Sequence, residues 1–197
     1  MFTAAILTSV LAYTWVLAPI APRWASAAAA AIVLALAVAR AMRSGEWGLG
    51  PGAFMPALRE AAVFTAAAAI LVALAGWRLG TWHARPTVWR DIGLLIPWAL
   101  GQQFALHTVL LRESQAATSR TIGIVIAAAL FAALHLPNPF LSAVTLIAAL
   151  AWCCIYDRHP NVLPLTLSHA LLTLIVLSAF DDAVTGHLRV GAGYLAR

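Results

Sequence analysis

Long apolar runs separated by short polar stretches make up most of the chain. Seven of these runs are close to the roughly 20 residues that a transmembrane helix needs. They cover residues 2–20, 24–39, 61–77, 92–111, 121–136, 140–156 and 162–180, of which the second and fifth are slightly short. The alternating pattern of a membrane β-barrel strand is missing, and helices are the other way to satisfy a backbone in lipid. The pattern therefore predicts an all-α fold, a polytopic transmembrane helix bundle of about seven helices.

The composition agrees with a membrane protein. Hydrophobic residues make up 63% of the 197 residues and charged residues 10%, whereas soluble domains contain about 45–50% and 25%. A water-soluble core and a disordered tail are both excluded. Tryptophans near the run ends are expected to form an aromatic belt at the membrane surface, namely Trp24, Trp77, Trp82, Trp89 and Trp152.

The net charge of +5 depends entirely on arginine, since the chain has twelve Arg and no Lys. These arginines lie at the ends of apolar runs, so we expect them to contact lipid headgroups. We therefore expect membrane lipid as a partner and no nucleic acid. Because seven spans leave six Arg on each side, the charge pattern assigns no orientation. Lys-free, Ala-rich usage is typical of a high-GC bacterial genome, so we expect an integral membrane protein of the bacterial cytoplasmic (inner) membrane.

The connections divide the chain without breaking it into separate domains. We expect a single integral membrane domain over residues 1–197, with front helices in 1–77 and a motif-bearing core at about 91–180. The Gly- and Pro-rich stretch 44–58 is expected to be a re-entrant or surface segment. The Leu-Pro-Asn-Pro sequence at 136–139 is expected to form a tight, helix-ending turn, because proline disfavours helical geometry in the residue before it.

Three of the apolar runs contain polar side chains that lipid should exclude. Such groups usually face the interior of a bundle and mark functional sites, although they also form simple packing hydrogen bonds between helices. Gln103 and His107 are four residues apart and so share a helix face. We expect one cavity, open to one aqueous face, on which five side chains converge: Gln102, Gln103, His107, His135 and His169.

The order and spacing of the polar residues resemble a known family. Three successive motifs carry the resemblance: Gln102-Gln103-x-x-x-His107, Phe131-x-x-x-His135 and His169-x-x-x-Thr173. Over residues 98–180 they are similar to the intramembrane CAAX-protease and bacteriocin-processing family, which includes the prenyl-protein endopeptidases. The usual family pattern is Glu-Glu-x-x-x-Arg, then Phe-x-x-x-His, then His-x-x-x-Asn or Asp. The first motif of this chain therefore departs from the family at all three positions.

The resemblance implies an intramembrane endopeptidase that hydrolyses a membrane-anchored protein or peptide without a cofactor. In the family, the first glutamate and the second-motif histidine activate a water, and the later histidine and its partner stabilise the oxyanion. Carried over, Gln102 and His135 take the first role, and His169 and Thr173 the second. Glutamine can orient a water but cannot remove its proton, so His135 would be the general base. The candidate catalytic set is Gln102, Gln103, His107, His135, His169 and Thr173.

Two other functions remain open at this point. A non-catalytic family member would keep the fold and bind a membrane protein segment in the former groove, because fold alone does not imply activity. Three neutral imidazoles with an open position also suit Zn²⁺, so His107, His135 and His169 are a weaker candidate metal site. Ion-coupled transport would favour carboxylates inside the membrane, and the apolar runs lack them.

Overall fold

The computed structural model describes residues 1–22 and 24–196, and this part of the chain is helical without a β-strand. Five helical segments are long and apolar enough to cross a membrane: Trp24–Ser44, Pro51–Leu79, Val88–Ala117, Pro139–Arg158 and Val162–Ala179. Two shorter apolar segments are Phe2–Leu17 and Arg120–Ala133. The predicted all-α polytopic bundle is therefore confirmed.

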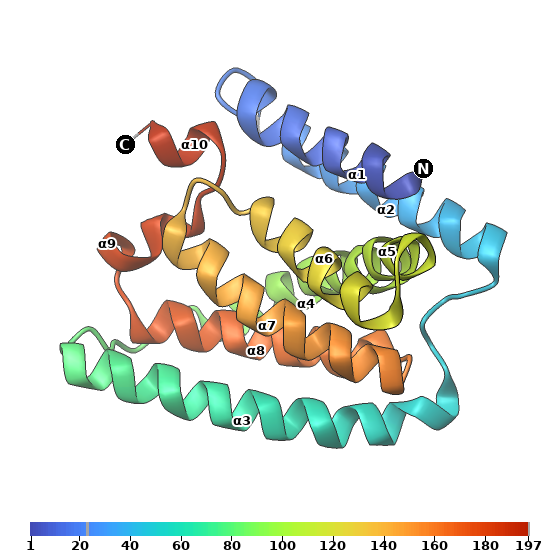
Figure 1. The fold of residues 1–197 in the computed structure, drawn as a ribbon. Coiled ribbons are helices and arrows are strands. Elements are labelled where there is room, and N and C mark those ends of the chain that lie inside the picture. The colour runs from blue at the N-terminus through green and yellow to red at the C-terminus, as the bar shows by residue number, and fades with distance from the viewer. Residues whose placement is uncertain (23, 197) are drawn as a thin grey trace.

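The elements follow one another along the chain as in Figure 1. They are α1 (Phe2–Leu11), η1 (Ala12–Leu17), α2 (Trp24–Ser44), η2 (Pro51–Ala53), α3 (Phe54–Leu79), α4 (Val88–Ala105), η3 (Leu106–Leu111), α5 (Arg112–Ala117), α6 (Arg120–Ala133), α7 (Pro139–Arg158), α8 (Val162–Ala179), α9 (Asp182–Thr185), η4 (Gly186–Leu188) and α10 (Ala192–Leu195). Of the two runs expected to be short, α2 extends to Ser44 whereas α6 has only 14 residues.

The charged side chains mark two aqueous ends of the bundle, at the right and left of Figure 1. At the right-hand end, which we call the α5 end, Asp157 of α7 is paired with Arg120 of α6 and lies 3.8 Å from Arg112 of α5. At the left-hand end, the α9 end, Arg85 pairs with Asp91 at 2.7 Å. A membrane-spanning bundle needs this arrangement, because unpaired charge is costly in lipid.

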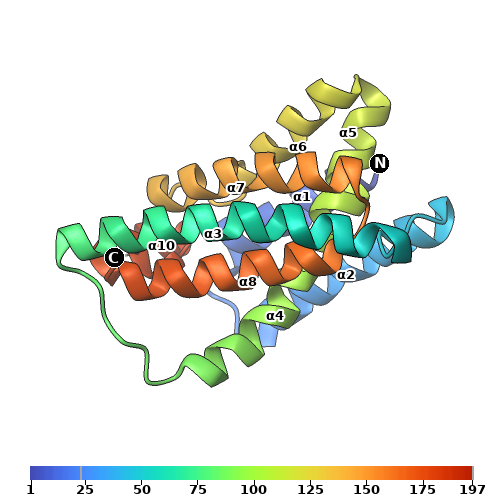
Figure 2. The same ribbon diagram turned by 90° about the horizontal axis from the view of Figure 1, so that it is seen from below.

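Helix α8 lies between α3 and α4 and packs against both, as Figure 2 shows. The contact with α3 is close near the α9 end, where a Cβ atom added to Gly76 would lie 2.4 Å from the Ala179 carbonyl oxygen. The absence of a side chain at Gly76 therefore permits the two backbones to approach.

The Gly- and Pro-rich stretch is a surface connection at the α5 end, followed by the first turns of α3. The Gly48 carbonyl accepts a hydrogen bond from the Val162 backbone N–H at 2.8 Å, and the Gly50 carbonyl accepts one from Asn161 Nδ2 at 3.0 Å. Gly48 has a φ of +62°, and a Cβ there would lie 2.6 Å from the Tyr156 hydroxyl. The stretch thus covers Tyr156 and requires glycine where it does so.

The Leu-Pro-Asn-Pro sequence forms the expected turn between α6 and α7. Asn138 is buried, and its Oδ1 accepts a hydrogen bond from the Leu141 N–H at 3.0 Å, which caps α7. Its Nδ2 donates to the carbonyls of Thr185 at 2.8 Å and Arg189 at 3.2 Å. Asn138 is therefore a structural residue that fixes the C-terminal segment to this turn.

The predicted aromatic belt is wrong for one of its five members. Trp24, Trp77, Trp82 and Trp89 are exposed, but Trp152 is only 2% exposed. Its indole N–H donates to the Ser168 hydroxyl at 2.9 Å, inside the bundle. Proximity to the end of an apolar run therefore does not separate an interfacial tryptophan from one that faces the core.

Gly76→Ala is expected to lower the free energy of unfolding by about 1–3 kcal/mol, because the added methyl group would force α3 away from the α8 backbone. Gly93→Ala is the control, since a Cβ there meets nothing within 4 Å and alanine favours a helix. Thermal unfolding in detergent measures both. Equal stability of the two variants would show that the close approach at Gly76 does not stabilise the bundle.

Candidate active site

The first and third motifs meet in the interior of the bundle. Gln103 of α4 is completely buried, and its amide Nε2 lies 3.2 Å from Nδ1 of His169 in α8. Both residues belong to helices that cross the apolar layer. This hydrogen bond therefore gives each of two polar side chains a partner that lipid could not supply.

His107 extends the site toward the α5 end. It lies in η3, a π-helical segment that directly follows α4, and its Nδ1 donates to the Gln103 carbonyl oxygen at 2.8 Å. Its ring stacks on Tyr156, with ring centroids 4.6 Å apart and planes 27° apart. The Arg112 guanidinium lies 5.2 Å from the centroid of the same tyrosine. In a π-turn the backbone hydrogen bonds span five residues instead of four, and such turns are frequent at functional sites.

His169 packs against Trp152, which is itself fixed by hydroxyl groups of two neighbouring helices. The Trp152 ring of α7 lies 4.8 Å from the His169 ring at 30°, and the indole N–H is bonded to Ser168. The Thr65 hydroxyl of α3 donates to the same Ser168 oxygen at 2.6 Å. Rotation of the imidazole is thus restricted by packing and by bonds to its neighbours.

His135 joins this group through the other residue of its motif. The Phe131 ring makes edge contacts with His135, at a centroid distance of 5.0 Å, and with His169, at 6.4 Å. Nδ1 of His135 donates to the Phe131 carbonyl oxygen at 2.8 Å. We call the connected set the histidine column; its members are Arg112, Tyr156, His107, Gln103, His169, Trp152, Phe131 and His135.

The hydrogen bonds assign opposite tautomers to the neutral forms of two histidines. A carbonyl oxygen only accepts, so Nδ1 of His135 carries the proton and Nε2 has a free lone pair. An amide nitrogen only donates, so Nδ1 of His169 is the acceptor and Nε2 carries the proton. One imidazole can therefore accept a proton, while the other can donate a hydrogen bond.

The remaining two candidate residues are less tightly held. Gln102 and Thr173 are half-buried, and neither side chain forms a hydrogen bond within the described residues. No hydrogen bond or ring contact within the described residues joins either of them to the column.

No carboxylate of the described chain is bonded to the motif side chains. Glu113 instead accepts from the backbone N–H groups of Phe2 at 3.1 Å and Thr3 at 2.9 Å. Asp157 is bonded to Gln115 at 2.8 Å and to Arg120. Neither acid replaces the missing glutamates, so any proton acceptor in the column must be a histidine.

The three histidines of the weaker metal hypothesis are not arranged as ligands. Within the described residues, no three His, Cys, Asp or Glu side chains come together in a way that could hold an ion. His107 and His135 each direct Nδ1 to a backbone carbonyl of their own helix region. The column is built from ring contacts, the Gln103–His169 hydrogen bond and histidine hydrogen bonds to backbone carbonyls.

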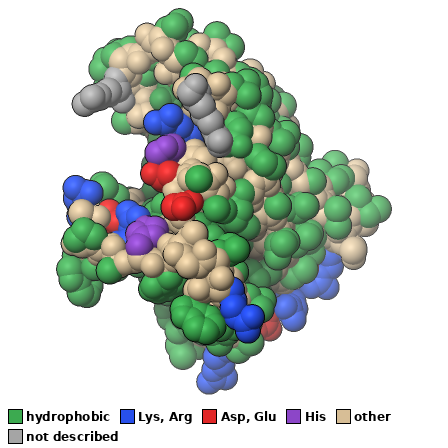
Figure 3. Space-filling view, turned by 90° about the vertical axis from the view of Figure 1, so that its left-hand side faces the viewer, with side chains coloured by type: hydrophobic (Ala, Val, Ile, Leu, Met, Phe, Trp, Pro, Cys, Tyr) green, Lys and Arg blue, Asp and Glu red, His purple; other side chains and the backbone are tan. Residues whose placement is uncertain are grey.

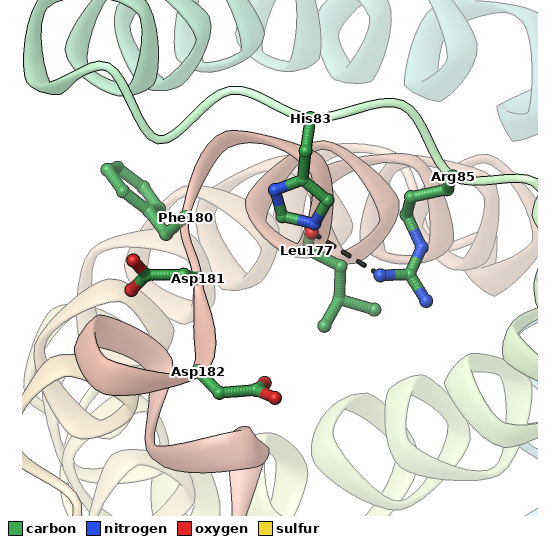
Figure 4. A pocket seen from close by; sticks show the side chains of 6 residues that line it. All are labelled: His83, Arg85, Leu177, Phe180, Asp181 and Asp182. Atoms are coloured by element: carbon green, nitrogen blue, oxygen red, sulfur yellow. Dashed lines mark hydrogen bonds between the residues drawn. The ribbon is translucent and has the colours of Figure 1, made fainter.

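Most of the column is buried, whereas His135 is half-buried. Gln103 and His107 are 0% exposed and His169 is 9% exposed. The charged surface of the α9 end (Figure 3) has a hollow of about 330 Å³, in which His83 and Arg85 face Leu177 and Asp182 (Figure 4). A second hollow lies between α3 and α7. Neither of these two hollows is lined by a motif residue, so the structure has no preformed hollow of this kind around Gln103, His107 and His169.

Sequence reasoning missed three residues of the site environment: Trp152, Tyr156 and Ser168. Trp152 and Tyr156 are four residues apart in one apolar run and therefore share a helix face. Each carries a polar group that needs a partner when it is buried. That spacing, and the position of Ser168 directly before His169, were the features of the sequence that could have indicated these residues.

Comparison with known proteins gives one match. The family model described as type II CAAX prenyl endopeptidase Rce1-like matches residues 85–175, which include all of the motif residues. No curated protein and no solved structure matches the chain. The match supports the resemblance carried by the three motifs: residues 85–175, the motif-bearing part of this chain, are similar to the type II CAAX prenyl endopeptidase Rce1-like family.

Proposed function

We propose that the protein is a divergent intramembrane endopeptidase that hydrolyses a peptide bond of a membrane-anchored protein. The proposal rests on the different Nδ1 partners of His135 and His169, from which opposite tautomers follow, and on the contact of both rings with Phe131. Hydrolysis by water needs a proton acceptor and an oxyanion donor close together. His135 has the free lone pair, and His169 has the free N–H.

The reaction can be written with these groups alone. Nε2 of His135 removes a proton from water as the oxygen adds to the peptide carbonyl, and Gln102 orients that water through its amide. The carbonyl becomes an oxyanion, which accepts hydrogen bonds from Nε2–H of His169 and from the Thr173 hydroxyl. The protonated His135 then gives its proton to the leaving nitrogen, the C–N bond breaks, and the amine separates from a carboxylic acid, which afterwards loses its remaining proton to the amine or to water.

The substitutions in the first motif fit this chemistry. A glutamate at position 103 would accept a hydrogen bond from Nδ1–H of His169, whereas the Gln103 amide donates one to Nδ1. Glutamine therefore leaves the proton of His169 on Nε2, where it can act as a donor. Without the glutamates, no arginine is needed to balance their negative charge. The position of that arginine is occupied by His107, which can be neutral. The site therefore requires no buried ion pair.

Two observations favour a non-catalytic family member as the second candidate. Gln103, His107 and His169 are buried, and glutamines stand at both positions of the motif acids. A protein with this site could bind a segment of a partner without cutting it, using the same membrane-embedded surface. For both candidates we propose the bacterial cytoplasmic membrane as the location and a membrane-anchored protein or peptide as the ligand. Prenylation of that ligand does not follow from the motifs.

His135→Ala is expected to abolish cleavage of membrane-tethered peptides, because it removes the proton acceptor. His169→Ala should lower cleavage about 10²- to 10³-fold, as loss of one oxyanion donor does. His83→Ala is the control, since His83 is an exposed histidine at the α9 end that lies outside the column. Cleavage of a library of membrane-tethered peptides and the thermal unfolding temperature are measured for all three variants. Unchanged cleavage by His135→Ala would end the protease proposal for this chain.

Two neighbouring glutamines should respond oppositely to the same change. Gln102→Glu adds a carboxylate at a half-buried position beside the water, so cleavage should stay equal or rise. Gln103→Glu should lower cleavage about 10²- to 10³-fold, because the carboxylate would draw the proton to Nδ1 of His169 and remove the Nε2 donor. Cleavage rates and melting temperatures of both variants are compared. A rise in activity for Gln103→Glu at wild-type stability would contradict the assigned roles.

A further inference from the structure

A groove separate from the histidine column lies between the start of α3 and the end of α7, at the α5 end. Its volume is about 500 Å³, which is within the roughly 300–1,000 Å³ of small-molecule sites. The residues that define its chemistry are Arg59, Glu60, Val63 and Phe64 of α3 with Ile155 and Arg158 of α7. It opens sideways, since Val63 is 72% exposed.

The groove is polar at one end and apolar at the other. Arg59 and Val63 are four residues apart on α3, and Ile155 and Arg158 are three apart on α7, so both helices present their charge one turn nearer the aqueous end. From Arg59 to Phe64 the helix rises by about 7.5 Å, from the charged end of the bundle into its apolar layer. A ligand that fills the groove must therefore have a polar end and an apolar tail.

The charges at the mouth of the groove do not cancel. The Glu60 carboxylate is shared by Arg158, at 2.7 Å, and His159, at 3.2 Å. Arg59 has no ion pair or hydrogen bond within the described residues. The mouth thus has one guanidinium without a counterion, which matches a singly charged anion.

We propose that this groove binds one anionic phospholipid of the surrounding bilayer. The lipid phosphate contacts Arg59, and an acyl chain lies over Val63, Phe64 and Ile155. The position supports this ligand, because basic pockets between membrane helices near the aqueous surface bind anionic headgroups. The apolar floor selects a lipid over a free anion, since it is left exposed when phosphate alone is bound.

The test uses the full chain in detergent and native mass spectrometry to count retained lipids. Phosphatidylglycerol and phosphatidylcholine with identical acyl chains are compared, with inorganic phosphate as the competitor. One phosphatidylglycerol should be retained in preference to phosphatidylcholine. Arg59→Ala should weaken that retention about fivefold, the effect of one arginine near an anionic membrane surface. Val63→Trp should also weaken it, because the indole would fill the groove while Arg59 is kept.

Arg78→Ala is the matched control, as Arg78 is the basic residue in the last turn of the same helix, away from the groove. It should retain phosphatidylglycerol like the unchanged chain. Equal losses for Arg59→Ala and Arg78→Ala would overturn the proposal, and so would equal retention of the two lipids. Displacement of the lipid by inorganic phosphate would show a plain anion site and would overturn it as well.

Discussion

The hydrogen bond between Gln103 and His169 is the contact on which the site depends. In the apolar layer neither side chain can turn to water, so each must find its partner within the bundle. Because the bond joins α4 to α8, it also fixes how the first and third motifs face each other. A buried donor or acceptor left without a partner costs roughly 1–3 kcal/mol, so this pairing constrains the neighbouring side chains as well.

The same bond decides what His169 can do. An amide donor at Nδ1 leaves a proton on Nε2, whereas the carbonyl acceptor at His135 leaves a lone pair there. A site that has lost its acids can therefore still contain one base and one donor without a buried net charge. The absence of the motif glutamates and of the motif arginine can then be explained together, because the site uses hydrogen bonds between neutral groups in place of ion pairs.

Much of the fold could be predicted because the membrane imposes simple rules. Runs of apolar residues near the length of a span became helices, and the Leu-Pro-Asn-Pro sequence ended α6 because proline and an asparagine cap stop one helix and start the next. The motif residues could be selected because polar groups in lipid are rare. Gln103, His135 and His169 lie in one connected group, as expected of such residues.

What could not be predicted depends on packing between helices. The π-helical segment at His107 is not encoded by a 3.6-residue pattern, and its ring faces Tyr156. Trp152 has the same apolar neighbours as an interfacial tryptophan, and only its distance from Ser168 and His169 separates the two roles. The complete burial of Gln103 likewise could not be predicted from the sequence, because it depends on how other helices pack against α4.

The most direct test of this account is nitrogen NMR of the full chain, labelled with ¹⁵N at its six histidines and held in detergent at a pH where the imidazoles are neutral. Signals of His135 and His169 are assigned by their disappearance in single substitutions. The account predicts that His169 is protonated on Nε2 and His135 on Nδ1. A His169 signal that shows the proton on Nδ1 would contradict it, because the site would then lack its hydrogen-bond donor.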